Sequence, residues 1–171
     1  MSQPPDVAAA WLPLPIEDSA PATAQAFDET YLHDTTRWLE DVELRALIDA
    51  PPISVASQRQ WFESLPTRPD YLIWGLASNG QRVGVFGLKN VTEEAAEYWG
   101  YIGEKTYWGR GLGRWMLTYC LQEARLRGLQ RVWLRVLPAN TRAIHLYQRL
   151  GFQPQPGVGD ALLRMERQLA E

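Results

Sequence analysis

A glycine-rich hexapeptide in the second half of the chain has the residue types needed to bind a phosphate group. It consists of Trp108, Gly109, Arg110, Gly111, Leu112 and Gly113. Glycines at alternate positions let the backbone approach a ligand closely, because no Cβ atom stands in the way. The residues that follow, 114–127, are compatible with a helix, whose first turn has unpaired N–H groups and a partial positive charge. The hexapeptide therefore predicts a phosphate cradle at the start of a helix.

A tyrosine farther along the chain could act as a proton donor. Tyr147 follows a strand-like run over residues 131–137, in a segment that begins at Asn140 and ends at Gly151 and Phe152. Asn is a favourable helix N-cap, and Gly followed by an apolar residue is typical of a left-handed helix end with a closing contact. A phenol is neutral at physiological pH and can donate its proton. On these residues alone, aromatic packing on an amphipathic helix is the favoured use of Tyr147.

The other ionisable residues are weaker candidates for chemistry. Glu97 is the first candidate for a general base and Glu104 is the second. Either of them could equally be an ordinary surface carboxylate. His33 and His145 are isolated in the sequence, and neither is assigned a catalytic role.

Hydrophobic periodicity and turn signals predict the elements that position these residues. Residues 36–49 predict a helix capped by Thr35 or Thr36, and a capping box that begins at Ser57 predicts a short helix to about Leu65. Strands are predicted over residues 71–77, 82–88, 95–103, 131–137 and 161–166. Asn79 and Gly80 are a hairpin signal between the first two strands. This order predicts an α/β fold of the α+β type, with a mixed, largely antiparallel sheet covered by helices.

Composition places the chain among ordinary single-domain globular proteins. It has 171 residues, of which 46% are hydrophobic and 22% charged. Residues 1–22, rich in Pro and Ala, are expected to lack a fixed structure, and residues 23–171 to form one domain. The sequence has no secretory signal and no apolar run of the roughly 18 residues that cross a membrane, so a cytoplasmic protein without a membrane partner is expected. The lone Cys120 excludes an internal disulfide and a multi-cysteine zinc site; we expect it to be a buried apolar residue, and we expect no metal.

The charge of the chain is divided unevenly between its halves. Residues 1–100 contain 6 Lys or Arg against 15 Asp or Glu, whereas residues 101–171 contain 11 against 5. An acidic half and a basic half in one domain suggest two ligands of opposite sign, a polyanion and a cationic amine. Chance variation of surface charge is the alternative. The net charge of only −3 argues against a general nucleic-acid-binding protein.

The order of these parts resembles the cofactor-binding half of the GNAT N-acetyltransferase superfamily over about residues 27–169. A glycine-rich hexapeptide alone would be weak support. Here it follows a strand, opens a helix and precedes a segment of the form N-x-x-A-x-x-x-Y-x-x-x-G-F, which begins at Asn140. The superfamily loop usually begins with Gln or Arg. Trp108 in that position resembles the branch that includes ribosomal-protein N-terminal acetyltransferases.

The resemblance implies a role for each matching residue. The hexapeptide from Trp108 to Gly113 would hold the pyrophosphate of acetyl-CoA. The backbones of Ile102, Gly103 and Glu104 would pair with the pantetheine arm, and one of their N–H groups would polarise the thioester carbonyl. Asn140 would contact the cofactor, and Tyr147 would protonate the departing thiolate. Some members carry a basic Glu at the position of Arg135, so Glu97 becomes the first candidate for that role here.

The resulting prediction is an enzyme that transfers an acetyl group from acetyl-CoA to a primary amine by direct attack in a ternary complex. The acceptor could be an amino sugar, because residues 53–62 loosely resemble enzymes that acetylate nucleotide-linked amino sugars. A peptide N-terminus is the close alternative, and polyamines and antibiotics stay open. A non-catalytic acyl-CoA-binding module is the alternative from another class, and Tyr147 argues against it. A monomer and a homodimer both remain open.

Overall fold

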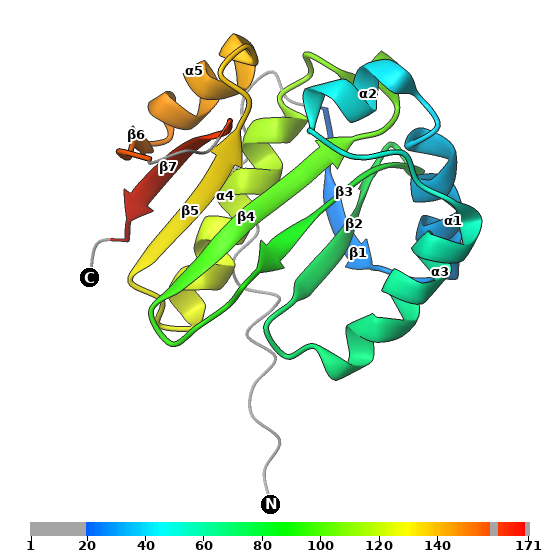
Figure 1. The fold of residues 1–171 in the computed structure, drawn as a ribbon, viewed down its shortest axis with the longest axis horizontal. Helices are drawn as coiled ribbons and strands as arrows, with labels where there is room; N and C mark the ends of the chain where they lie inside the picture. The colour runs from blue at the N-terminus through cyan, green and yellow to red at the C-terminus, as the bar shows by residue number, and fades with distance from the viewer. Residues whose placement is uncertain (1–19, 158–160, 170–171) are drawn as a thin grey trace, which may run out of the picture.

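The computed structural model of the protein describes residues 20–157 and 161–169. These residues form a seven-stranded sheet in the order β1-β2-β3-β4-β5-β7-β6, with helices on both faces (Figure 1). Strands β4 and β5 are parallel, and all other neighbouring strands of the described sheet are antiparallel. The expected mixed, largely antiparallel sheet is therefore confirmed. Residues 1–19, most of the segment expected to lack a fixed structure, lie outside the described residues.

The elements follow one another in a regular order along the chain. The strands are β1 (Thr23–Ala26), β2 (Leu72–Ser78), β3 (Gln81–Lys89), β4 (Ala95–Ile102), β5 (Arg131–Val136), β6 (Gln153–Pro154) and β7 (Leu163–Gln168). The α-helices are α1 (Glu29–Trp38), α2 (Val42–Leu47), α3 (Val55–Ser64), α4 (Leu112–Leu126) and α5 (Thr141–Arg149), and two short 3₁₀ turns are η2 (Leu65–Thr67) and η3 (Lys105–Tyr107). The five longer predicted strands are confirmed to within two residues, whereas the short β1 and β6 were not predicted.

The single helix predicted over residues 36–49 is wrong, because the chain forms two helices there. Asp28 caps α1 and Asp41 caps α2, each by accepting two backbone N–H groups of the helix it precedes. Thr35, one of the two expected caps, lies inside α1, and its hydroxyl donates to the Leu32 carbonyl at 2.9 Å. The spacing of apolar residues over 36–49 is compatible with one helix, but the Asp41 carboxylate caps a second helix within that range.

One local turn prediction is confirmed by backbone geometry, and one predicted capping box lies three residues earlier than expected. Asn79 and Gly80 both have positive φ, 51° and 75°, as the tight turn between β2 and β3 requires. Helix α3 begins at a capping box as expected, but the box joins Ser54 and Ser57, three residues before the predicted start. The turn and the capping box are each formed by residues that lie within four positions of one another in the sequence.

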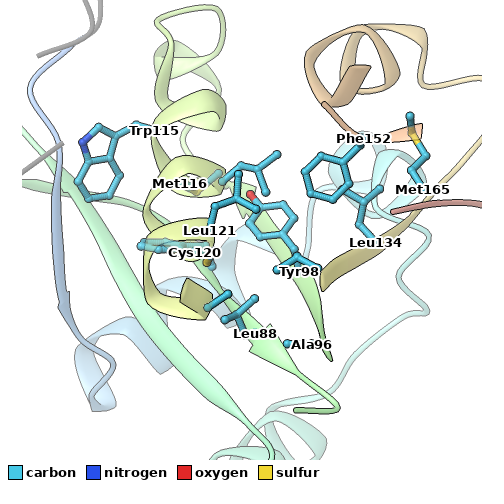
Figure 2. Packing of buried hydrophobic residues seen from close by; sticks show 14 of the residues in the cluster. Leu88, Ala96, Tyr98, Trp115, Met116, Cys120, Leu121, Leu134, Phe152 and Met165 are labelled. Carbon is cyan, nitrogen blue, oxygen red and sulfur yellow. The ribbon is translucent and has the colours of Figure 1, made fainter. Parts of the chain in front are cut away.

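The main hydrophobic core lies between the sheet and α4. Cys120 and Leu117 of α4 are fully buried there, and Figure 2 shows Tyr98 of β4 among side chains of α4 and Phe152. Burial raises the pKa of the Cys120 thiol well above its usual value, so this residue behaves as the expected small apolar side chain. A smaller cluster joins α1 and α2 to the opposite face of the sheet through Trp38 and Leu44.

Strands β4 and β5 pair only briefly before they separate. Their register joins Ala95 to Arg131, Ala96 to Val132 and Glu97 to Trp133, and then stops. Beyond Glu97, β4 continues to pair with β3, and β5 continues to pair with β7. The two parallel strands therefore have facing backbone edges without a ladder between them, and an extended ligand could bind there.

Candidate functional site

The glycine-rich hexapeptide forms the turn that opens α4. Gly109 and Gly111 have φ of 76° and 79°, in the left-handed region where a side chain would be strained. Gly111 is the N-cap of α4 and offers no side-chain acceptor to the first N–H groups of the helix. Those groups could therefore bind an anion, and the phosphate cradle stays a prediction.

A cavity of about 970 Å³ extends from this turn. It is lined by α2, by the end of β4, by the start of α4 and by α5. Five of the six predicted loop residues line it: Trp108, Gly109, Gly111, Leu112 and Gly113. The side chain of Arg110 instead lies over the ring of Tyr107, 5.0 Å from its centroid.

The cavity reaches both faces of the sheet. Tyr98 belongs to the core on the α4 side, and Tyr101 packs with the cluster on the α1 and α2 side, yet both line the cavity. These two residues lie on the part of β4 that no longer pairs with β5. The cavity therefore extends through the gap between the strands, and two ligands could meet there from opposite faces.

Tyr147 lines this cavity from α5. Its ring lies 6.5 Å from the ring of Tyr98 and 6.2 Å from that of Phe152, measured between centroids. Burial raises the pKa of Tyr147 to about 12, so its hydroxyl keeps its proton at physiological pH. The phenol is thus placed in the cavity in the protonated form that a general acid needs.

The two ends of α5 have the predicted caps. The Asn140 side chain accepts the Ala143 N–H at 3.3 Å, and Asn140 also lines the cavity. At the other end Gly151 has φ of 83°, and the Phe152 N–H donates to the Tyr147 carbonyl at 3.0 Å. These bonds form the expected left-handed helix end and fix the orientation of α5.

The end of β4 places only one of its three predicted cofactor residues on the cavity. Ile102 lines it, whereas the N–H groups of Gly103 and Glu104 both donate to the Val83 carbonyl, at 2.8 and 3.2 Å. A Cβ atom at Gly103 would lie 2.1 Å from the Trp38 ring, so this residue turns toward α1. The expected pairing of Gly103 and Glu104 with a pantetheine arm therefore conflicts with bonds that the fold already uses.

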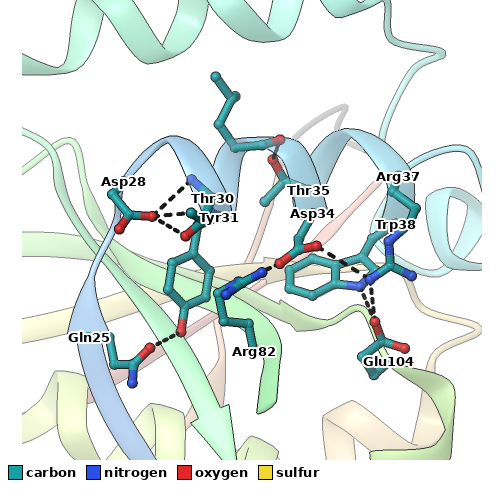
Figure 3. A network of polar contacts seen from close by, with 11 residues as sticks. Gln25, Asp28, Thr30, Tyr31, Asp34, Thr35, Arg37, Trp38, Arg82 and Glu104 are labelled. Atoms are coloured by element: carbon teal, nitrogen blue, oxygen red, sulfur yellow. Dashed lines mark hydrogen bonds and ion pairs between the residues drawn. The ribbon is translucent and has the colours of Figure 1, made fainter. Parts of the chain in front are cut away.

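Glu104 belongs to a polar network that joins α1 to the loop after β4 (Figure 3). Its carboxylate accepts the Trp38 Nε1–H at 2.8 Å and a hydrogen bond from Arg37. Burial tends to raise the pKa of Glu104, but the bonds from Trp38 and Arg37 outweigh it, and the pKa is lowered. A carboxylate held in the charged form by two donors is a poor base, so the second candidate base loses its support.

Glu97, the first candidate base, is not brought together with Tyr147. Its side chain is 3% exposed, and it is not among the residues that line the cavity. Its carboxylate accepts Arg135 Nε at 3.0 Å and Asn90 Nδ2 at 2.7 Å, and Lys89 Nζ lies 3.8 Å away. Arg135, which stands where some relatives carry a Glu, is thus the ion-pair partner of Glu97. Glu97 is therefore a buried carboxylate at the last paired position of β4, held in an ion pair with the more exposed Arg135.

Sequence reasoning missed several residues of the cavity wall. Leu44, Leu47 and Ile48 line it from α2, and Tyr98 and Tyr101 line it from β4. The pattern of apolar residues predicted a helix and a strand over these positions, but it could not say which side chains would line a cavity. That distinction depends on where α2 packs, and α2 itself was not predicted as a separate helix.

Trp108 connects the loop to the end of β4 through its side chain. Its Nε1–H donates to the Ile102 carbonyl at 2.8 Å. We expect Trp108→Phe to lower the free energy of unfolding by about 1 kcal/mol more than Trp99→Phe, because only the first change removes a made hydrogen bond. Trp99 is the matched control: among the described residues, its Nε1 is buried without a hydrogen-bond partner. Urea denaturation measures both, and equal losses would show that the Trp108 bond contributes nothing.

Among residues 20–157 and 161–169, no group of three or more His, Cys, Asp or Glu side chains could hold a metal ion. Within the same ranges, no helix is long and apolar enough to cross a membrane.

About half of the chain is similar in sequence to curated acetyltransferases. The [ribosomal protein bS18]-alanine N-acetyltransferase of Escherichia coli K12 is 34% identical over 82 residues, which cover 48% of this chain and 55% of that protein. The chain thus spans about half the length of the curated relatives that it matches.

Solved structures share the fold over most of the chain. The spermidine N-acetyltransferase from Vibrio cholerae, in complex with CoA and spermine, has a TM-score of 0.77 at 17% identity and covers 86% of this chain and 95% of its own. A domain from Methanocaldococcus jannaschii also has a TM-score of 0.77, at 21% identity over 88% of this chain and 100% of its own. A family model described as the acetyltransferase (GNAT) family matches residues 29–152, which is most of the sequence. The chain therefore belongs to the GNAT acetyltransferase family.

Proposed function

We propose that this protein transfers the acetyl group of acetyl-CoA to a primary amine. One observation carries the proposal: a single cavity joins the free N-terminus of α4 to Tyr147 and passes through the gap between β4 and β5. The first feature suits the phosphates of the cofactor, the second a proton transfer, and the gap an extended pantetheine arm. Membership of the GNAT family, whose members use acetyl-CoA, supports the same cofactor.

The cofactor would bind chiefly through backbone groups. Its pyrophosphate would accept the N–H groups at the turn from Gly109 to Gly113, where alternate glycines leave the backbone accessible. Its pantetheine arm would lie along β4 between Tyr98 and Ile102, whose outer edge has no strand partner. This placement moves the expected pantetheine contact from residues 102–104 toward the preceding residues of β4, because the N–H groups of Gly103 and Glu104 are already bonded to Val83.

The proposed reaction is direct transfer without an acyl-enzyme. The amine nitrogen attacks the thioester carbonyl carbon, a new C–N bond forms, and the C–S bond breaks. Tyr147 donates its phenolic proton to the departing thiolate, the attacking nitrogen releases one proton to solvent, and solvent returns a proton to Tyr147. Cys120 takes no part as a nucleophile, because it is fully buried in the core and its pKa is raised.

We assign no general base. Glu97 and Glu104 are each held by two or more donors, and neither lines the cavity. Deprotonation of the amine in solution before binding would be sufficient for attack, and this predicts a rate that rises with pH through the pKa of the free amine. Glu97→Gln should lower stability, through loss of its ion pair with Arg135, more than it lowers kcat, as urea denaturation and the thiol-release assay would show.

An assay of thiol release tests the proposed function directly. Acetyl-CoA is incubated with the protein and with a panel of short peptides, amino sugars and alkyl amines, and free CoA thiol is measured. The proposal expects release that depends on both the protein and an amine, with calorimetric binding of CoA. Binding of CoA without amine-dependent release for any amine would instead identify a non-catalytic acyl-CoA-binding module.

Binding of CoA should also depend on salt. Arg114, Arg142 and Arg149 line the cavity, and the Arg142 guanidinium lies 3.1 Å from the position that a Cβ atom on Gly109 would take. We expect affinity to fall between 0.1 and 1 M NaCl, because the Debye length shrinks from about 10 Å to about 3 Å. Arg142→Gln should weaken binding and flatten this dependence, whereas Arg125→Gln at the opposite end of α4 should do neither. Calorimetry across the salt range measures both effects, and salt-independent affinity would contradict the electrostatic part of the proposal.

A further inference from the structure

The wall of the cavity formed by α2 is apolar. Leu44, Leu47 and Ile48 line it, beside Tyr101 and Trp108. Leu44 is 2% exposed and fixes the helix to the α1 cluster, while Leu47 is 37% exposed at the rim. The wall therefore presents branched aliphatic side chains to whatever enters from this side.

The acidic residues of α2 point elsewhere. Lys105 Nζ lies 2.7 Å from an Asp41 carboxylate oxygen and also binds the Glu43 carboxylate. Neither acid is among the residues that line the cavity, although both belong to the acidic half of the sequence. Among the described lining residues, the charged ones are Arg114, Arg142 and Arg149. These two acids are thus paired with Lys105 rather than directed at the cavity.

The α2 wall lies on the face of the sheet opposite α4, the helix that begins at the phosphate cradle. The cradle opens α4, which packs on the Tyr98 face of the sheet, whereas α2 packs with Tyr101 on the other face. A cofactor held at the cradle reaches the gap between β4 and β5 from the α4 side. The amine must then approach the thioester from the α2 side, and the group next to the amine would contact Leu47.

We propose that the α2 wall selects an amine whose neighbouring group is apolar and uncharged, and that it disfavours polyamines. This inference rests on the proposed function. Binding of an alkyl group against Leu44, Leu47 and Ile48 is favourable, because apolar surface is removed from water. A second ammonium group in the same place would lose its hydration without a carboxylate to replace it.

Two amines of equal length test the selection. n-Pentylamine and 1,5-diaminopentane differ only in a second ammonium group at the far end of the chain. The proposal expects kcat/KM to be at least about tenfold higher for n-pentylamine, with the difference mainly in KM, as for other apolar pockets that discriminate by a single group. Spermidine should behave like the diamine.

Substitutions on α2 provide a matched pair for the same test. Leu47→Glu places a carboxylate at the cavity rim and should shift the preference at least about tenfold toward the diamine, and Leu47→Lys should shift it the other way. Val42→Glu adds the same charge to the same helix at a residue that is 70% exposed and does not line the cavity, so the preference should not change. Thermal melting confirms that each variant is folded.

The outcomes separate this inference from the proposed function. No amine-dependent thiol release with any amine would overturn both. Thiol release with the diamine at least as efficient as with n-pentylamine, or a preference that Leu47→Glu leaves unchanged, would overturn the α2 selection and leave the acetyltransferase proposal standing. A preference for n-pentylamine that Leu47→Glu reverses and Val42→Glu does not would support it.

Discussion

Replacing Tyr147 with Phe is expected to lower kcat about 10²–10⁴-fold, the usual contribution of a general acid. The change removes only the hydroxyl, so the ring contacts with Tyr98 and Phe152 remain. The melting temperature and the affinity for acetyl-CoA should therefore change little. Because the phenol would act mainly in the transition state, kcat and kcat/KM should fall together.

Single-turnover measurement of thiol release, with the chemical step rate-limiting, gives the cleanest readout. Tyr119→Phe is the matched control, because it also removes a phenol, but at a residue of α4 that packs against the core and does not line the cavity. A Tyr147→Phe protein that releases thiol at nearly the wild-type rate would reduce Tyr147 to a packing residue.

The raised pKa of Tyr147 adds a signature in the pH profile. Burial raises it to about 12, so the acid keeps its proton while the amine becomes deprotonated near pH 10. The wild-type rate should rise with pH and show no loss from Tyr147 until pH approaches 12. An alkaline decline centred near the ordinary tyrosine pKa of about 10 would contradict this assignment.

The same shift predicts a loss of stability in alkali. Between about pH 10 and pH 12 the unfolded chain ionises this tyrosine, whereas the folded protein retains the proton. The unfolded state then binds fewer protons, so the free energy of unfolding falls as pH rises, by about 1.4 kcal/mol per pH unit for one such residue. The stabilising effect is complete below pH 10, and urea titrations across this window would show its loss.

Filling the phosphate cradle is expected to produce the second large effect. Gly113→Ala should lower CoA affinity at least about tenfold, and Gly113→Val about a hundredfold, since each backbone bond to a charged group contributes about 1.5–3 kcal/mol. Gly113 is a better choice than Gly111, whose φ of 79° would strain any other residue. Gly113 is helical, and an added Cβ would meet only Leu146 Cδ2, at an ordinary 3.4 Å.

Gly113→Ala should weaken the binding of CoA without lowering the stability of the fold. Alanine in a helix is favoured over glycine by about 1 kcal/mol, so Gly113→Ala should melt at or above the wild-type temperature while it binds CoA more weakly. Gly157→Ala is the control, because nothing lies within 4 Å of its added methyl group. Unchanged calorimetric affinity in a stably folded Gly113→Val protein would remove the cradle assignment.

The sequence by itself determined the features that depend on a few adjacent residues. The left-handed glycines before α4, the Asn79-Gly80 turn and the caps of α5 at Asn140 and Gly151 all lie where local chemistry predicted them. Positive φ and a missing helix partner are satisfied within a few residues, so their signals survive in any tertiary context. The order of elements around these signals was enough to indicate the family.

Tertiary structure alone decided which of the remaining candidates meet. In the folded chain Glu97 forms an ion pair with Arg135, and Gly103 faces Trp38. Strands β4 and β5 separate beyond Glu97. Lys105 pairs with Asp41 and Glu43, neither of which lines the cavity, whereas Leu47 does. These outcomes depend on residues that are distant in sequence, because burial and ion pairing follow from how whole elements pack. Periodicity could therefore mark these side chains as apolar or charged, but it could not say which of them would line the cavity.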